Sequence, residues 1–216
     1  MSALRLTELF DVKDKVVVIT GGGRGIGRMM ADGFVQNGAK VYIASRDVEA
    51  CQATADELNA KGPGKCFALR ANLLSEAACK KLAEDVAKHE TKVDVLINNS
   101  GVGWGGDVKH HPEKAWTKVL SVNVTSPFHQ IDSIAYDTSK AAVHHMTRVL
   151  AAKLARRPNG GHILVNAIAP GLVPTKLSTG IALVTGKSFE ELQQNIPTQR
   201  YGHASDMAGL AIFLAS

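Results

Sequence analysis

The feature that most constrains this chain is a run of glycines between a β-branched segment and a helical one. Val16–Thr20 is wholly β-branched and predicts a buried strand. The next residues read Gly-Gly-Gly-Arg-Gly-Ile-Gly, and a helical pattern then continues to about Asn37, where Gly38 would end it. Glycines let a backbone reverse tightly, so the chain is expected to open with a strand–turn–helix unit.

The same alternation of strand and helix continues along the chain. Further strands are predicted at Val41–Ala44, Cys66–Leu69, Val93–Ile97 and His162–Ile168. Helices are predicted after an Asp47 cap, from Ser75 to Lys88, from Pro112 to Val122, from Ala135 to Leu154, from Ser188 to Asn195, and from Ser205 onward. Alternating strands and helices indicate an α/β protein with a parallel sheet covered on both faces. We expect one domain over residues 1–216.

The composition is that of a folded globular chain. Of the 216 residues, 45% are hydrophobic and 21% are charged, and the formal net charge is +5. Lys and Arg do not cluster with aromatic residues, so no nucleic-acid partner is expected. No apolar run is long enough to span a membrane, so no membrane partner is expected either.

Cysteine usage and the first residues point to a reducing compartment. Cys51, Cys66 and Cys79 are odd in number and lack CxxC spacing, which argues against a disulfide framework and a zinc site. The charged N-terminal segment lacks the apolar core of a signal peptide. We therefore expect a cytoplasmic protein without a bound metal.

The glycine turn is suited to bind a phosphate group. Glycines between a strand and a helix let the backbone approach a pyrophosphate, which would rest on the helix N-terminus. The residues expected at this contact are Gly21, Gly23, Arg24, Gly25, Ile26 and Gly27. Arg28-Met29 follows Gly27, so the turn is not a P-loop. The alternative is a glycine-rich turn that binds no ligand.

The end of the second strand selects between the two nicotinamide cofactors. An acidic side chain there would accept hydrogen bonds from the ribose hydroxyls of NAD, whereas the 2′-phosphate of NADP requires a cation. This chain offers Ser45 and Arg46, with Arg24 in the glycine turn, and Asp47 is better placed as a helix cap. A guanidinium binds phosphate through paired charge-assisted hydrogen bonds, so NADP(H) is the expected cofactor. Alternatively, both arginines are solvated surface charges.

Tyr136 and Lys140 form a candidate acid–base pair. They are four positions apart in a predicted helix and therefore share one face. A free tyrosine has a pKa near 10 and exchanges protons poorly at neutral pH. An adjacent ammonium group favours the phenolate and lowers the pKa of the phenol.

Several of these segments together resemble the short-chain dehydrogenase/reductase family. The glycine turn matches its T-G-x-x-x-G-x-G pattern, and Asn98-Asn99-Ser100-Gly101 resembles its N-N-A-G turn. The segment YDTSKAAVHHMTRVLA is similar to the family's catalytic helix. The likeness is strongest to the rhamnolipid-type 3-oxoacyl-carrier-protein reductases and their fungal relatives. It implies a Rossmann-type, doubly wound parallel sheet and a nicotinamide-dependent oxidoreductase.

The resemblance also implies roles for individual residues. Tyr136 would protonate the carbonyl oxygen of a small-molecule ketone that receives hydride from the nicotinamide, and Lys140 would bind the nicotinamide ribose. Asn123 matches the family asparagine that holds a water molecule beside the lysine. Further cofactor contacts would come from Asn72, Leu73, Asn99, Gly101, Pro170, Gly171, Val173 and Thr175. Relatives assemble through the helices that contain Asn123 and Tyr136, so the resemblance allows a homo-oligomer.

Parts of the family pattern are missing. Only VTSPFHQIDSIA separates Asn123 from Tyr136, which is too short for a helix end, a strand of about five residues and a loop. In relatives this interval holds the fifth strand and the catalytic serine, and both are expected to be absent here. Ser133 is interpreted as a helix N-cap. The chain also stops at Ser216 before the position of the last strand in relatives.

Two functions therefore stay open from the sequence. The first is an NADPH-dependent reductase of 3-oxoacyl or related ketones. The second is a catalytically impaired isoform that binds nucleotide or pairs with intact relatives, because a displacement of about 1 Å at a catalytic group can cost about 10²-fold in rate. A nucleic-acid-binding module with a nucleotide-like fold is a third, weaker alternative.

Overall fold

The structure is a computed structural model. It describes residues 6–101, 113–114, 117, 119–120, 134–156, 161–176, 178–179 and 186–216. The chain divides into two compact units, one formed by residues 1–100 and 170–216 and the other by residues 101–169. Each unit is described by itself.

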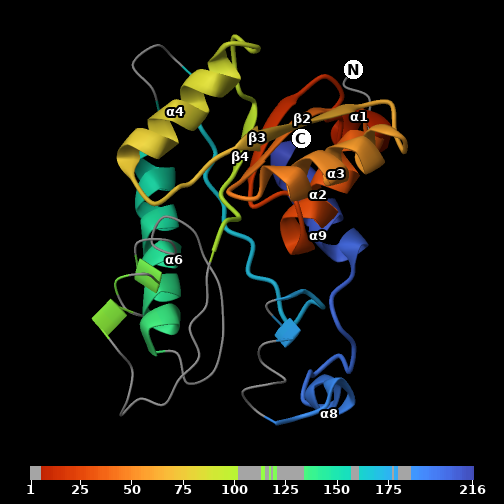
Figure 1. The fold of residues 1–216 in the computed structure, drawn as a ribbon, viewed down its shortest axis with the longest axis vertical. Helices are drawn as coiled ribbons and strands as arrows, with labels where there is room; N and C mark the ends of the chain where they lie inside the picture. The colour runs from red at the N-terminus through yellow and green to blue at the C-terminus, as the bar shows by residue number, and fades with distance from the viewer. Residues whose placement is uncertain are drawn as a thin grey trace. The chain divides into compact units, whose positions relative to one another are not determined.

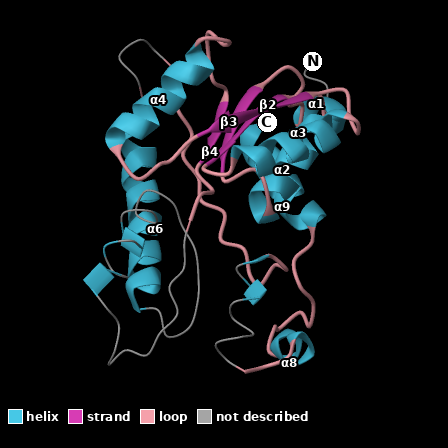
Figure 2. Cartoon of the chain, in the orientation of Figure 1, coloured by secondary structure: helices cyan, strands magenta, loops and turns pink. Residues whose placement is uncertain are grey.

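The first unit is built on a parallel sheet of four strands. The strands are β1 (Val16–Thr20), β2 (Lys40–Ser45), β3 (Lys65–Arg70) and β4 (Val95–Ile97). Their order is β3-β2-β1-β4, with Val17 opposite both Val41 and Val95 (Figure 2). All four strands run in the same direction, so their carboxyl ends share one edge of the sheet. The predicted α/β class and parallel sheet are confirmed.

Helices precede, connect and follow these strands. In the first unit they are α1 (Leu6–Leu9), α2 (Gly25–Gln36), α3 (Val48–Asn59), α4 (Glu76–Ala87), α8 (Phe189–Gln194) and α9 (Ala204–Ala215). The predicted Asp47 cap forms, since its side chain accepts a hydrogen bond from the Ala50 amide. Ser75 caps α4 in the same way, by accepting a hydrogen bond from the Ala78 amide. Ser188 opens α8 with a capping box.

The alternation of side chains along β1 divides the core into two layers. Val16 and Val18 pack with Tyr42, Leu82 and Val86 on the face covered by α4. Val17 and Ile19 are fully buried and point to the opposite face, because successive side chains of a strand alternate. Figure 1 shows α2, α3 and α9 on that opposite side. Helices thus cover both faces, as a doubly wound fold requires.

The packing of α9 against α2 brings the end of the chain back to its beginning. A Cβ atom built on Gly33 in α2 would lie 2.5 Å from the Cβ of Ala208 in α9. The Lys15 ammonium, just before β1, donates a hydrogen bond to the Ala215 carbonyl at 2.5 Å. The rings of Phe10 and Phe213 lie 5.9 Å apart.

The described part of the second unit is dominated by one long helix, α6 (Ile134–Leu154). Its bounds agree with the prediction of Ala135–Leu154. The predicted strand His162–Ile168 is wrong, because these residues have no regular secondary structure. Leu164 is 71% exposed, and the Ile163 amide donates to the Leu154 carbonyl instead of to a strand. The predicted helix from Pro112 to Val122 lies mostly outside the described residues.

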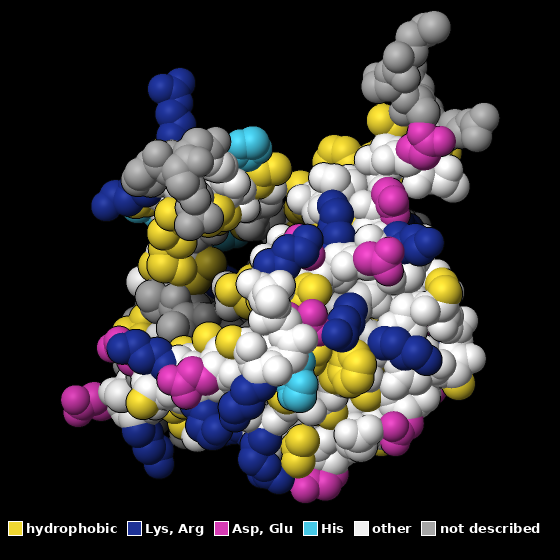
Figure 3. All heavy atoms as spheres, turned by 90° about the horizontal axis from the view of Figure 1, so that it is seen from above, with side chains coloured by type: hydrophobic (Ala, Val, Ile, Leu, Met, Phe, Trp, Pro, Cys, Tyr) yellow, Lys and Arg dark blue, Asp and Glu magenta, His cyan; other side chains and the backbone are white. Residues whose placement is uncertain are grey.

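Charged groups of both signs lie together on the surface. Figure 3 shows Lys and Arg side chains interspersed with Asp and Glu on the face viewed. The ion pairs of the described surface include Arg70 with Glu49 and Arg200 with Asp206. Within the described residues, no helix is long and apolar enough to cross a membrane, and no group of His, Cys, Asp and Glu could hold a metal ion.

Candidate active site

The glycine turn connects β1 to α2 through a backbone conformation that residues with side chains rarely adopt. Gly21 and Gly25 have φ angles of +68° and +56°, in the left-handed region that favours glycine. A Cβ atom on Gly27 would lie 2.5 Å from the Gly21 carbonyl oxygen. The turn is therefore tight, and Gly25 and Gly27 place no side chain at the start of α2.

The start of α2 is suited to bind an anion. Arg24 is the N-cap residue, and no side chain in the described structure caps this helix terminus. The first turn also contains no acidic residue. Free backbone N–H groups and the positive end of the helix dipole attract a phosphate, so this terminus fits a pyrophosphate.

Asn99 ties the end of β4 to the glycine turn. Its side-chain amide donates to the carbonyl oxygens of Thr20 and Gly21, at 3.0 Å and 3.2 Å. The Thr20 hydroxyl accepts hydrogen bonds from the backbone amides of Asn99 and Ser100, both at 3.0 Å. These bonds fix the ends of β1 and β4 against each other. Gly101 is exposed and begins the second unit.

At the end of β2, Ser45 and Arg46 lead into the cap of α3. The Ser45 hydroxyl donates to the Asp47 carbonyl at 2.8 Å and accepts from the Cys51 thiol at 3.3 Å. Burial raises the pKa of Cys51, and the hydrogen bond to Ser45 opposes that rise. Arg46 is exposed beside this group.

Arg70 also belongs to this group, although the sequence pattern did not predict it there. It is the last residue of β3 and pairs in register with Ser45. Its guanidinium donates to the Arg46 carbonyl at 3.2 Å and to the Glu49 carboxylate at 3.1 Å. Nothing in the spacing of the sequence marks this residue, because only the strand register places it beside Arg46. After it, Asn72 is exposed and Leu73 packs against the core.

The segment from Pro170 to Thr175 returns to the first unit beside the glycine turn. A Cβ atom on Gly25 would lie 3.4 Å from Cγ2 of Thr175, so these two predicted contacts are neighbours. The Thr175 amide donates to the Ser178 hydroxyl at 2.8 Å, which closes a small turn. Pro170 and Val173 are buried, and Gly171 is exposed.

The candidate acid–base residues belong to the second unit. Tyr136 and Lys140 are one turn apart in α6, but the Tyr136 side chain and all of Asn123 lie outside the described residues. Burial lowers the pKa of Lys140 to about 7. A lysine in this state can exchange a proton near neutral pH. Ser139, next to it, is fully buried.

Comparisons with known proteins bear on both units. A family model described as short chain dehydrogenase matches residues 15–135, and one described as enoyl-(acyl carrier protein) reductase matches residues 130–216. The chain is 36% identical to the rhamnolipids biosynthesis 3-oxoacyl-(acyl-carrier-protein) reductase of Pseudomonas aeruginosa, covering 95% of this chain and 91% of that protein. The alternative of an impaired isoform receives no support from these matches.

Solved structures of similar proteins support the same fold. The RhlG/NADP active-site complex of Pseudomonas aeruginosa matches with a TM-score of 0.86 and 35% identity, over 96% of this chain and 91% of that one. An NADP-bound, putative NAD(P)-dependent gluconate 5-dehydrogenase from Beutenbergia cavernae matches with a TM-score of 0.83 and 30% identity, over 96% of this chain and 92% of that one.

The alignment with the Pseudomonas reductase is longer than this chain. It spans 239 positions, whereas this chain has 216 residues, so at least 23 positions lie opposite gaps in this chain. The Pseudomonas reductase therefore carries residues that have no counterpart here.

Proposed function

Because the chain belongs to the short-chain dehydrogenase family, we propose that it is an NADP(H)-dependent oxidoreductase that reduces a 3-oxoacyl-type or related ketone to a secondary alcohol. The main observation in support of a bound cofactor is the start of α2, which follows a glycine turn and has no side-chain cap. The relative at 36% identity is named a 3-oxoacyl-(acyl-carrier-protein) reductase, which supports the substrate class.

Most of the residues proposed to bind the cofactor belong to the first unit. The backbone from Gly21 to Gly27 would hold the pyrophosphate, and Arg24, Ser45 and Arg46 would bind the 2′-phosphate. The remaining contacts would come from Asn72, Leu73, Asn99, Gly101, Pro170, Gly171, Val173 and Thr175. When bound, NADPH supplies the hydride.

Tyr136 and Lys140 supply the proton chemistry. In the reduction, the Tyr136 hydroxyl gives its proton to the carbonyl oxygen of the substrate, and in the oxidation the phenolate takes it back. The Lys140 ammonium favours the phenolate and so lowers the pKa of the phenol. Asn123 would hold a water molecule beside Lys140.

The setting of the enzyme follows from the same arguments. We propose a cytoplasmic location, since Cys51, Cys66 and Cys79 are all free, as in proteins of reducing compartments. The partner is a small-molecule carbonyl compound. A homo-oligomer is proposed from the resemblance to the family and can be tested by light scattering.

The test is NADPH oxidation with a panel of 3-oxoacyl thioesters, compared in wild type and Tyr136→Phe. We expect turnover in the wild type and a loss of at least about 10²-fold in the variant, because general acid catalysis contributes about 10²–10⁴-fold. NADPH affinity should stay within a few fold. A folded wild type that binds NADPH but turns over no ketone of the panel would contradict the proposed activity.

A further inference from the structure

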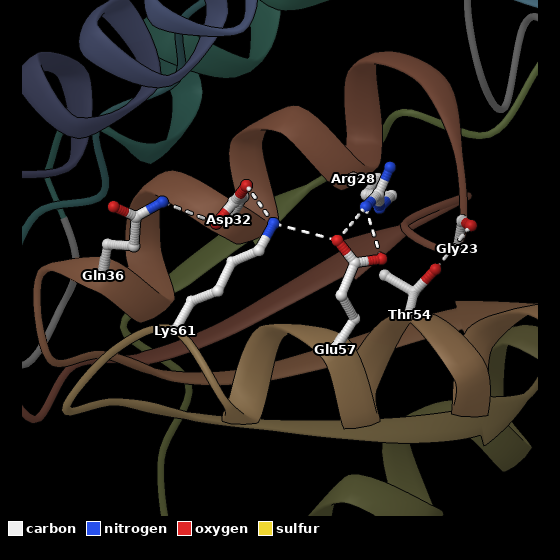
Figure 4. A network of polar contacts seen from close by, with 7 residues as sticks. All are labelled: Gly23, Arg28, Asp32, Gln36, Thr54, Glu57 and Lys61. Carbon is white, nitrogen blue, oxygen red and sulfur yellow. Dashed lines mark hydrogen bonds and ion pairs between the residues drawn. The ribbon is translucent and has the colours of Figure 1, made fainter.

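The helix α3 lies directly against the tip of the glycine turn. A Cβ atom on Gly23 would lie 2.9 Å from the sulfur of Cys51 and 3.2 Å from its backbone nitrogen. One turn further along α3, the Thr54 hydroxyl donates a hydrogen bond to the Gly23 carbonyl oxygen at 2.9 Å (Figure 4). Thr54 is only 6% exposed. The tip of the turn is thus held from one side by two α3 residues.

This hydrogen bond determines the orientation of the peptide that joins Gly23 to Arg24. The peptide between Gly23 and Arg24 is planar, with its N–H opposite its C=O. Because the carbonyl is bound to Thr54, the Arg24 amide must point away from α3. Arg24 then continues in an extended conformation, with φ of −165° and ψ of 171°, into the first turn of α2. The orientation of one peptide therefore fixes where the Arg24 side chain begins.

The position of α3 is itself fixed against α2. The Arg28 guanidinium lies 2.5 Å and 2.6 Å from the two carboxylate oxygens of Glu57, and Lys61 contacts both Glu57 and Asp32 (Figure 4). Exposed ion pairs stabilise little one by one, but this network joins the two helices along several turns. Thr54 lies one turn before Glu57 on the same helix, so these ion pairs also hold Thr54 in place relative to α2.

We propose that Thr54 is a positioning residue for the NADP 2′-phosphate: by holding the Gly23–Arg24 peptide, it presents Arg24 to that group and adds to the preference for NADPH over NADH. This inference rests on the proposed function, in which Arg24 binds the 2′-phosphate. NADH lacks that phosphate, so it gains nothing from the placement of Arg24.

The test compares dissociation constants for NADPH and NADH in wild type, Thr54→Val and Thr54→Ser. Thr54→Val keeps the shape of the side chain and removes the donor. We expect NADPH binding to weaken by about 3–10-fold, the range of one hydrogen bond, and NADH binding to change by less than about 2-fold. Thr54→Ser keeps a hydroxyl and should restore the wild-type ratio of the two constants.

A second background separates positioning from a general structural effect. In Arg24→Ala, Thr54→Val should no longer change the ratio of the two dissociation constants, because the residue it positions is gone. Thr147→Val in α6 is the matched control, since the Thr147 hydroxyl also donates to a backbone carbonyl, that of Val143 at 2.9 Å. This control should leave both constants unchanged.

Urea unfolding shows which variants are folded, and Thr54→Ala replaces Thr54→Val should the latter not fold. The inference is overturned when folded Thr54→Val binds both cofactors as tightly as the wild type, or binds NADPH and NADH more weakly by the same factor. It is also overturned when Thr54→Val reduces the preference for NADPH by the same factor in the Arg24→Ala background as in the wild type. A wild type that binds neither cofactor would instead contradict the proposed function.

Discussion

At the scale of single residues, burial changes the acid–base chemistry of Lys140. Its pKa falls from 10.5 to about 7, because the charged form loses water. In the unfolded chain the same lysine would keep its ordinary value. Between pH 7 and 10.5 the unfolded state therefore binds more protons than the folded state.

The pH dependence of stability should reveal this lysine. Since its folded pKa is depressed, its contribution to stability is complete above 10.5 and is lost as the pH falls through about 7. We expect Lys140→Met to be more stable than the wild type at pH 7, with the difference shrinking toward pH 10. Urea unfolding at several pH values measures this, and a difference that stays constant with pH would contradict it.

The preference for NADPH should depend on Arg46. Arg46→Asp replaces a cation with a carboxylate, which repels the 2′-phosphate and can accept hydrogen bonds from the ribose hydroxyls of NADH. We expect the preference to shift toward NADH by at least about tenfold, which corresponds to about 1.4 kcal/mol. Dissociation constants for both cofactors test this, with Arg156→Asp, two residues after the end of α6, as a charge-matched control. An unchanged ratio would remove Arg46 from the phosphate site.

Among elements, the crossing of α2 and α9 depends on the absence of one side chain. At Gly33 an added Cβ would lie 2.5 Å from the Cβ of Ala208 and 3.4 Å from its Cα. Both atoms belong to a packed helix and cannot move apart without shifting it. A Cβ atom added at Gly209, next to Ala208 in the sequence, would meet no atom of the described residues within 4 Å apart from its chain neighbours and the backbone of its own helix.

Two alanine substitutions should therefore have opposite effects on stability. Gly33→Ala overpacks the crossing, and although alanine favours a helix, we expect a net loss of about 1–2 kcal/mol. Gly209→Ala gains the helix propensity without a clash and should add about 0.5–1 kcal/mol. Urea unfolding measures both.

A double variant checks the cause. Ala208→Gly should be less costly in the Gly33→Ala background than in the wild type, because it removes the atom that clashes. Equal costs in the two backgrounds would show that this contact does not set the crossing.

The segment His162–Ile168 shows why an apolar run alone does not make a strand. Its composition is that of a buried strand, yet Leu164 is 71% exposed. A strand exists only where a neighbour supplies hydrogen-bond partners, and in the described residues β4 pairs with β1 alone. Strand propensity is thus a local property of the sequence, whereas strand pairing depends on residues that are distant in the sequence.

For the molecule as a whole, cofactor binding should appear as stability. A ligand that binds only the folded state at 100 times its dissociation constant adds about 2.7 kcal/mol. For a chain of this size we expect NADPH to raise Tm by roughly 5–10 °C. Differential scanning fluorimetry with Arg46→Asp as the control tests this, and an equal rise in both proteins would contradict binding through the 2′-phosphate.

Much of the first unit could be predicted because its signals are local. The bounds of β1, the Asp47 cap and the end of α2 just before Gly38 each depend on neighbouring residues. The glycine turn belongs to this class, since its spacing alone requires a tight connection between strand and helix.

Other features depend on residues that are distant in the sequence. Arg70 reaches Arg46 only through the register of β2 and β3, and Thr175 reaches Gly25 only because the chain returns to the first unit. Thr54 binds Gly23 because the packing of α3 on α2 brings them together. The sequence by itself determined the local elements and the chemical groups available, whereas tertiary packing decided which of them meet.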